Sequence, residues 1–205
     1  MKLKYEITGI QHPENPKLFR IRALRLNLKF HINPGDIGGY VEHEGNLSHT
    51  GSCWIGDDAC VYENACILND ARVYGIARVF GNAQLSEHAW VFDGALIYGS
   101  ARLCDTCLVF DDAQVFGNAI VTGNGSIYGE ARVYGDARVC DVASVTGDAV
   151  ANETMVISGN SEVSSTAQIY HNDGITILLS IDGELTTHGT VDLEHHKMLA
   201  RLKLL

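Results

Sequence analysis

The chain has 205 residues, of which 15 are Lys or Arg and 25 are Asp or Glu, giving a formal net charge of −10. Apolar residues make up 46%, which suits a globular core, and the acidic balance argues against binding nucleic acid through its phosphates. No apolar run reaches the ~20 residues of a membrane span and the first ten residues lack a secretory signal, so we expect a cytoplasmic protein with free thiols at its six cysteines.

Residues 1–50 lack the repeat that follows them and predict an N-terminal β cap. The segments YEITGI (5–10) and LFRIRALR (18–25) indicate two strands, separated by the Pro-containing loop HPENPK (12–17). The next segment, GDIGGYVEHEGNLS (35–48), is rich in turn residues. We expect Val41 and Leu47 to plug the open end of the domain that follows.

A six-residue repeat defines the central domain, residues 51–175. Every sixth position from Ile55 to Ile175 carries Val, Ile or Leu, except Ala151, and the position two residues earlier is mostly Ala. Residues two apart lie on one face of a strand, so each unit predicts a short strand with a small and a branched residue inside. The two positions after the strand are often Gly-Asn or Gly-Asp, which favour a sharp turn.

Two residues depart from these columns close together. Ala151 is smaller than the branched residues of its column, and Met155 is larger than the alanines of its own. We expect the flexible Met155 side chain to fill the space that Ala151 leaves.

Residues 176–205 form a third part of the chain, because the repeat ends at Ile175. The segment ITILLSIDGELTTHG (175–189) predicts a hairpin with an Asp-Gly turn. The segment VDLEHHKMLARLKLL (191–205) has the pattern of an amphipathic helix, which we expect to cap the last coil or to lie along an aromatic face.

The repeat resembles a known family. Units such as VYGDAR (133–138), VFGNAQ (79–84) and IYGEAR (127–132) are similar to the hexapeptide repeat of left-handed parallel β-helices, [LIV]-x-x-x-[STAV]-x. The resemblance implies an all-β solenoid: a single-stranded left-handed parallel β-helix of about seven triangular coils, each made of three units and rising ~4.8 Å. The segment 35–48 resembles the entry segment of phage- and prophage-encoded hexapeptide-repeat proteins of unknown function, which implies no catalytic residues.

Two faces of such a solenoid would carry aromatic ladders, because residues 18 apart stack on one face. The first face collects Tyr74, Trp90, Phe92, Leu108, Phe110 and Tyr128, and the second collects Phe80, Tyr98, Phe116 and Tyr134. The ladders either stabilise the strands or form contact surfaces. Under the second interpretation, the first face carries one contiguous apolar patch covered by another subunit or by the C-terminal segment; its members are Trp90, Phe92, Leu108 and Phe110.

Catalysis is a second hypothesis, because many hexapeptide-repeat proteins are trimeric acyltransferases that use acetyl-CoA or an acyl carrier protein and a histidine as general base. The resemblance implies His88, at a corner of the coils, as that base. The alternative is a polar corner residue. The loop that often closes over the substrate in those enzymes has no counterpart in the uninterrupted repeat, which weighs against catalysis.

No metal site is predicted. Cys104 and Cys107 form a lone CxxC, but the repeat places Cys104 outside and Cys107 inside, so a shared zinc ion is not expected. His195 and His196 are adjacent on the expected helix and point in different directions, whereas metal pairs prefer a spacing of four residues.

Many acidic residues fall at corners, where they would form rows along the edges of the solenoid. Asp suits exposed turns, which is sufficient reason for this placement. The other interpretation is a rod that mimics the charge of a nucleic acid and occupies the basic groove of a DNA-binding host protein.

We therefore expect a non-enzymatic binding or scaffold protein of phage or prophage type, without a cofactor. It would self-associate as a trimer or dimer, or bind a host protein, through the faces of the solenoid. The alternatives are an acyltransferase with acetyl-CoA as its cofactor and an acidic mimic of a nucleic acid.

Overall fold

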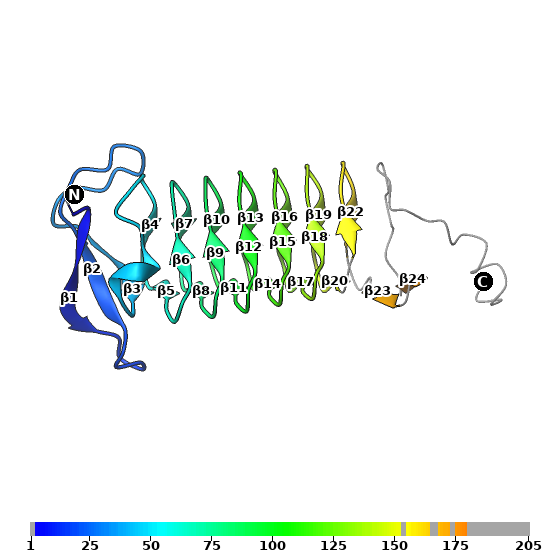
Figure 1. Cartoon of the computed structure of the whole chain (residues 1–205), viewed down its shortest axis with the longest axis horizontal. Helices are drawn as coiled ribbons and strands as arrows, with labels where there is room; N and C mark the ends of the chain where they lie inside the picture. The colour runs from blue at the N-terminus through cyan, green and yellow to red at the C-terminus, as the bar shows by residue number, and fades with distance from the viewer. Residues whose placement is uncertain (1–2, 153–154, 165–167, 173–174, 180–205) are drawn as a thin grey trace.

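The structure, a computed structural model, describes residues 3–152, 155–164, 168–172 and 175–179. The chain forms an all-β parallel solenoid of stacked coils, drawn as a rod in Figure 1. Strands 18 residues apart pair in parallel, as Trp90 with Leu108 and Leu96 with Gln114. This confirms the three units per coil and the stack of about seven coils that the resemblance to hexapeptide-repeat proteins implied.

Three sheets make up the sides of the rod, and most of their strands have only two residues. We call the first sheet face 1, and it contains β4 (Trp54–Ile55), β7 (Arg72–Val73), β10 (Trp90–Val91), β13 (Leu108–Val109), β16 (Ser126–Ile127), β19 (Ser144–Val145) and β22 (Glu162–Val163). Face 3 contains β6 (Cys66–Ile67), β9 (Gln84–Leu85), β12 (Arg102–Leu103), β15 (Ile120–Val121), β18 (Arg138–Val139) and β21 (Val156–Ile157).

Face 2 is the longest sheet, because strands of the N-terminal cap continue it at one end and an antiparallel pair continues it at the other. Its solenoid strands are β5 (Cys60–Val61), β8 (Arg78–Val79), β11 (Leu96–Ile97), β14 (Gln114–Val115), β17 (Arg132–Val133) and β20 (Val150–Ala151). The cap adds β1 (Tyr5–Gln11), β2 (Phe19–Ala23) and β3 (Ile37–Val41), and the far end adds β23 (Gln168–Asn172) and β24 (Ile175–Leu179).

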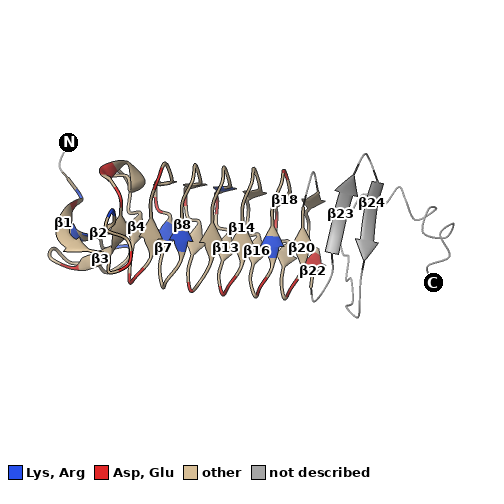
Figure 2. Ribbon diagram, turned by 90° about the horizontal axis from the view of Figure 1, so that it is seen from below, with Lys and Arg blue, Asp and Glu red and all other residues tan. Residues whose placement is uncertain are grey.

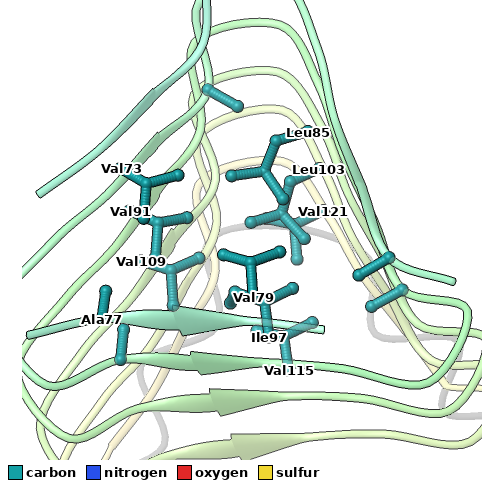
Figure 3. Close-up of a cluster of buried hydrophobic side chains, with 14 of the residues drawn as sticks. Val73, Ala77, Val79, Leu85, Val91, Ile97, Leu103, Val109, Val115 and Val121 are labelled. Atoms are coloured by element: carbon teal, nitrogen blue, oxygen red, sulfur yellow. The ribbon is translucent and has the colours of Figure 1, made fainter. Parts of the chain in front are cut away.

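The core is a set of aliphatic columns inside the rod. Val73, Val91 and Val109 lie one above another, beside the columns of Leu85 and Val79 (Figure 3). All five residues have no exposed surface, and the alanines of the second column are equally buried. The six-residue period therefore predicted the core correctly: the small residues lie where the chain turns and the branched residues fill the centre.

The irregular residues of the last coils are also part of this core. Ala151 is fully buried and Met155 is 6% exposed, and both belong to the same apolar cluster. Asn152 follows Ala151 on the outer side of face 2, where it is buried and its Nδ2 donates to the Tyr134 hydroxyl at 3.1 Å. The idea that Met155 fills the space left by Ala151 remains a prediction.

Each described corner of the coils turns through a residue with positive φ, two positions after the branched core residue. This residue is Gly at some corners, such as Gly123 (φ 65°), and acidic or Asn at others, such as Asp105 (φ 59°). Its backbone N–H faces the preceding coil and often donates there to an acidic side chain. Gly123 N donates to Asp105 Oδ2 at 2.8 Å, and Asp105 N donates to Glu87 Oε2 at 3.0 Å.

The same hydrogen bond recurs along the rod, so many corner acids link one coil to the next. The further pairs are Asp57 with Gly75 N, Glu63 with Gly81 N, Asp111 with Gly129 N and Asp141 with Gly159 N, at 2.9–3.0 Å. The corner rows expected from the sequence are present, and Figure 2 shows Asp and Glu along the corners. These bonds give the acids a structural role beyond suiting a turn.

The cap differs from its prediction in having a third strand. β3 lies within the segment expected to hold turns, pairs antiparallel with β2, and pairs in parallel with β5 of the first coil. Gly38 and Gly39 permit this approach, since a Cβ at either would lie 2.5 Å from a backbone oxygen, that of Ile55 or Ala59. The two glycines of the entry segment are thus needed for the cap to continue face 2.

Asn46 joins the cap to the first coil from a short 3-10 helix, η1 (Glu44–Asn46). It is fully buried and uses its whole amide group: Oδ1 accepts from the backbone N–H groups of Glu42 and His43, and Nδ2 donates to the carbonyls of Glu63 and Ala65. Val41 and Leu47 are fully buried as well, consistent with the plug expected at this end.

The C-terminal part differs from its prediction in where the antiparallel pair lies. β23 pairs in parallel with β20 and antiparallel with β24, so Ile175 belongs to an antiparallel strand and not to another coil. Residues 180–205, which include the second strand of the expected hairpin and the expected helix, lie outside the described residues. Among the described residues, no helix is long and apolar enough to cross a membrane.

Candidate functional site

The apolar patch expected on face 1 is contiguous. Trp90 lies beside Leu108 in register, its ring centroid is 4.7 Å from that of Phe92, and the two planes are tilted by 39°. Phe92 stacks on Phe110 and Phe110 on Tyr128, each at 4.9 Å with nearly parallel rings. We define the face-1 patch as Trp90, Phe92, Leu108, Phe110 and Tyr128, all of them half-buried.

The end of the face-1 patch nearest the cap is closed by packing that the sequence did not predict. The Arg72 guanidinium lies over the Trp90 ring at 4.1 Å and over Phe30 of the cap at 4.7 Å. Tyr74, expected in the same ladder, is half-buried against the core, and its ring covers Gly56 one coil earlier. The structure therefore separates Tyr74 from the patch, because the glycine leaves room for the ring on the side facing the cap.

Face 2 carries the longer aromatic ladder. Tyr62, Phe80, Tyr98, Phe116 and Tyr134 stack at centroid separations of 5.0, 5.1, 4.7 and 4.7 Å, with planes within 9° of parallel. Each inner ring covers the faces of its neighbours and shows only its edge to solvent. The ladder therefore stabilises the stack of coils and has no free inner ring face for a ligand.

His88 lies at a corner where the cap meets the coils. Its side chain is 55% exposed, and Nε2 lies 3.7 Å from Oδ2 of Asp70. The Asp70 carboxylate accepts from Lys29 Nζ at 2.6 Å and from the backbone N–H of Ser52 at 2.8 Å. The Lys29 hydrogen bond holds the pKa of Asp70 below its usual value. His88 thus borders an ion pair that fastens the cap to the coils.

The six cysteines are free thiols within or on the solenoid. Cys104 is half-buried on face 3 and Cys107 is fully buried inside, as the repeat predicted. Burial raises the pKa of both thiols, so they are poor nucleophiles. Among the described residues, no group of three His, Cys, Asp or Glu side chains is arranged to hold a metal ion.

Acidic residues are concentrated at the edge between face 1 and face 2. Among the described residues, that edge carries Asp57, Asp58, Asp93, Asp111, Asp112, Glu130 and Asp148. The edge between face 2 and face 3 carries Glu63 and Asp136 there, and the edge between face 3 and face 1 carries Asp70, Glu87, Asp105 and Asp141. Asp112, Glu130 and Asp148 are exposed and 18 residues apart, and so form a row on successive coils.

The structure also shows a basic region in the cap that sequence reasoning missed. Seven of the 15 Lys and Arg fall within residues 1–34, against two of the 25 Asp and Glu, so a count by segment would have revealed it. A pocket of about 390 Å³ lies beside the loop between β2 and β3, with Lys4, Arg25, Lys29 and His49 in its wall. Leu28 in the same wall is 76% exposed.

One segment of the chain matches a model of a known protein family. Residues 113–129, which contain β14, β15 and β16, match the family model described as the YdcK beta solenoid repeat. The chain is a β-solenoid repeat protein. The matched segment is about one coil long and includes Phe116 and Tyr128 of the two ladders. No curated protein matches the chain.

Proposed function

We propose that this solenoid is a non-enzymatic scaffold that associates with a second copy of itself through the face-1 patch. The observation that supports this most is the patch itself, a continuous strip of aromatic and aliphatic side chains across three successive coils. Aromatic residues are enriched at protein interfaces because they bury a large area with few rotatable bonds.

The rod behind the patch favours this role because it holds the side chains in place before any partner arrives. Each coil is hydrogen-bonded to the next through its strands and, at many corners, through an acidic side chain. Little conformational freedom is then lost when the face is covered, which lowers the cost of association. A dimer or trimer formed on face 1 would leave the face-2 ladder and the acidic edge available for other contacts.

The similarity of residues 35–48 to the entry segments of phage and prophage proteins supports a phage-type origin and a host protein as a further partner. The structure gives that segment a structural explanation, since its glycines and Asn46 join the cap to the first coil. A host partner therefore rests on the resemblance, whereas self-association rests on the face-1 patch.

Paired variants test self-association through face 1. Phe92→Ser with Phe110→Ser removes two rings from the face-1 patch. The matched control is Phe80→Ser with Phe116→Ser, which removes two rings from the face-2 ladder. Light scattering during gel filtration should show loss of assembly for the first pair and retention for the second. Equal loss in both pairs would mean that stability, not contact, explains the result.

Acyl transfer is the second candidate, favoured by one observation, the 3.7 Å approach of His88 Nε2 to the Asp70 carboxylate. A carboxylate beside a histidine can orient the ring of a general base. Calorimetric titration with CoA tests this candidate independently of assembly. CoA binding that is lost in His88→Ala would support the acyltransferase hypothesis. The absence of a binding signal at millimolar CoA would exclude it.

A further inference from the structure

We propose that the pocket in the cap binds an anionic head group that carries an apolar chain, as in an alkyl phosphate or an anionic lipid. The pocket lies beside the loop between β2 and β3, at the N-terminal end of the rod shown in Figure 1. It shares no residue with the face-1 patch, so this inference goes beyond the proposed scaffold function and can fail separately from it.

The charge of the pocket wall is the first reason. Lys4, Arg25 and Lys29 line the pocket of about 390 Å³, and no Asp or Glu does so among the described residues. This is unusual in a chain with 25 acidic residues and a net charge of −10. Lys29 is paired with Asp70, so Lys4 and Arg25 are the cations of this wall without a carboxylate partner among the described residues. Cations without such a partner attract an anion from solvent.

Lys4 supplies a charge that is fixed in place. It is 8% exposed, and its Nζ donates to the carbonyl oxygen of Cys53 at 2.8 Å and to Cys53 Sγ at 3.0 Å. An ammonium group has three N–H donors, and these two bonds use two of them. Both partners of Lys4 are neutral groups, and an anion in the pocket would supply the countercharge that a buried cation favours.

His49 adds a hydrogen-bond donor without an acceptor. The backbone N–H of Lys4 donates to His49 Nδ1 at 3.3 Å, which places the proton of the neutral ring on Nε2. The Tyr5 ring stacks on the imidazole at 4.4 Å and fixes its orientation. His49 Nε2 is buried and has no hydrogen-bond partner in the described part of the chain. An unpaired buried donor is costly, and a small shift of the ring would let a ligand in the pocket accept from it.

Arg25 completes the cationic wall at its exposed rim. Lys29 already pairs with Asp70, but Arg25 forms no ion pair with any described residue. A planar guanidinium with five donors suits phosphate and carboxylate oxygens. Arg25 is therefore the side chain whose removal should weaken head-group binding without loosening the cap.

The apolar chain of the ligand is inferred from the leucines next to these cations. Leu26 and Leu28 line the same pocket and are 55% and 76% exposed. Large apolar side chains at such exposure, set between Arg25 and Lys29, give the loop both parts of an amphiphile-binding surface. The acidic residues of the coils should not repel such an anion strongly, because charges farther than about 8 Å away are largely screened at physiological salt.

Calorimetric titration of the full chain with three probes separates the two parts of the ligand. Inorganic phosphate presents the head group alone, octyl phosphate presents both parts, and octyl glucoside presents the chain without charge. We expect octyl phosphate to bind roughly tenfold or more tightly than inorganic phosphate, since each methylene buried against leucine strengthens binding about fourfold. Octyl glucoside should give no measurable binding.

Two exposed substitutions and two matched controls assign the effect to this pocket. Arg25→Gln should weaken both phosphate ligands, and Leu28→Ser should weaken octyl phosphate while leaving inorganic phosphate unchanged. The controls are Arg102→Gln and Ile76→Ser on the coils, which remove an exposed arginine without an ion pair among the described residues and an apolar residue that is 66% exposed. Neither control should change binding.

Vesicles of phosphatidylcholine, with or without phosphatidylglycerol, identify the source of the head group. Sedimentation with the anionic vesicles alone, lost in Leu28→Ser, assigns the pocket to a lipid surface. Octyl phosphate binding without vesicle binding assigns it to a soluble amphiphile. The proposal is wrong if octyl phosphate binds no better than phosphate, if octyl glucoside binds equally well, or if Arg25→Gln and Arg102→Gln behave alike.

Discussion

Asp105 connects three successive coils at one edge, so its replacement tests whether the corner acids hold the rod together. Its Oδ2 accepts from Gly123 N at 2.8 Å, and its own N–H donates to Glu87 Oε2 at 3.0 Å. It also turns the corner with φ 59°. Asp105→Ala removes the acceptor for Gly123 and places a residue with no polar side chain in the left-handed region.

The expected loss of stability follows from those two effects. A hydrogen bond to a charged group contributes about 1.5–3 kcal/mol, but solvent screening at an exposed corner reduces this to roughly 1 kcal/mol. The left-handed conformation, which Asp tolerates better than Ala, adds up to about 1 kcal/mol. Asp105→Ala should therefore lower the free energy of unfolding by about 1–2 kcal/mol.

Asp112→Ala is the matched control, because Asp112 is an exposed corner acid that accepts no hydrogen bond from a backbone N–H of the described residues. Its effect should stay within about 0.5 kcal/mol. Asp105→Asn keeps an acceptor without the charge and should fall between the wild type and Asp105→Ala. Urea unfolding followed by circular dichroism measures all four proteins.

The pH dependence separates the hydrogen bond from the backbone strain. The bond from Gly123 N–H holds the pKa of Asp105 below its usual value. A carboxylate with a lowered folded-state pKa stabilises fully above its unfolded pKa of about 3.9, and that contribution is lost as the pH falls through the folded-state pKa. The difference between wild type and Asp105→Ala should be largest at neutral pH and shrink on acidification. A difference that grows in acid, or equals that of Asp112→Ala, would refute the reasoning.

Three further substitutions test the interior and the ladder. Ala151→Val should lower the melting temperature, because Met155 already fills the space, and a higher melting temperature in a thermal scan would show that it does not. Phe116→Ala removes two ring contacts at 4.7 Å and should lower the free energy of unfolding in urea by about 2–4 kcal/mol. A loss within about 0.5 kcal/mol, the range of an ordinary surface substitution, would show that the ladder does not stabilise the fold. Cys107→Ser buries a hydroxyl inside the rod and should cost about 1–3 kcal/mol, whereas Cys140→Ser on face 3 should have little effect; equal effects would place Cys107 outside the core.

The repeat and the core could be predicted because both follow from the alternation of side chains along a strand. A small and a branched residue two positions apart must share a strand face, and a period of six repeats that choice from Ile55 onward. The residues so selected, such as Val91 and Val109, are fully buried. The adjacency of Trp90 and Phe92 followed from their spacing of two residues on one strand face. That of Phe92 and Phe110 followed from steps of 18, which rest on the three units per coil that the resemblance implied.

What the sequence did not reveal depends on contacts that the repeat does not encode. Tyr74 leaves its ladder because Gly56, one coil earlier, opens space for the ring, and this is a relation between two individual residues. The third cap strand appears because Gly38 and Gly39 let it approach the first coil. Corner acids were recognised as turn residues, but their bonds to the next coil required the direction of the backbone N–H groups.

Sedimentation equilibrium of the wild-type chain over a range of concentrations tests the scaffold proposal most directly. The chain has a mass of 22.3 kDa. Association through the face-1 patch predicts a mass that is a whole multiple of this value and that returns to 22.3 kDa in the variant with Phe92→Ser and Phe110→Ser. A wild-type mass of 22.3 kDa at every concentration would contradict the account.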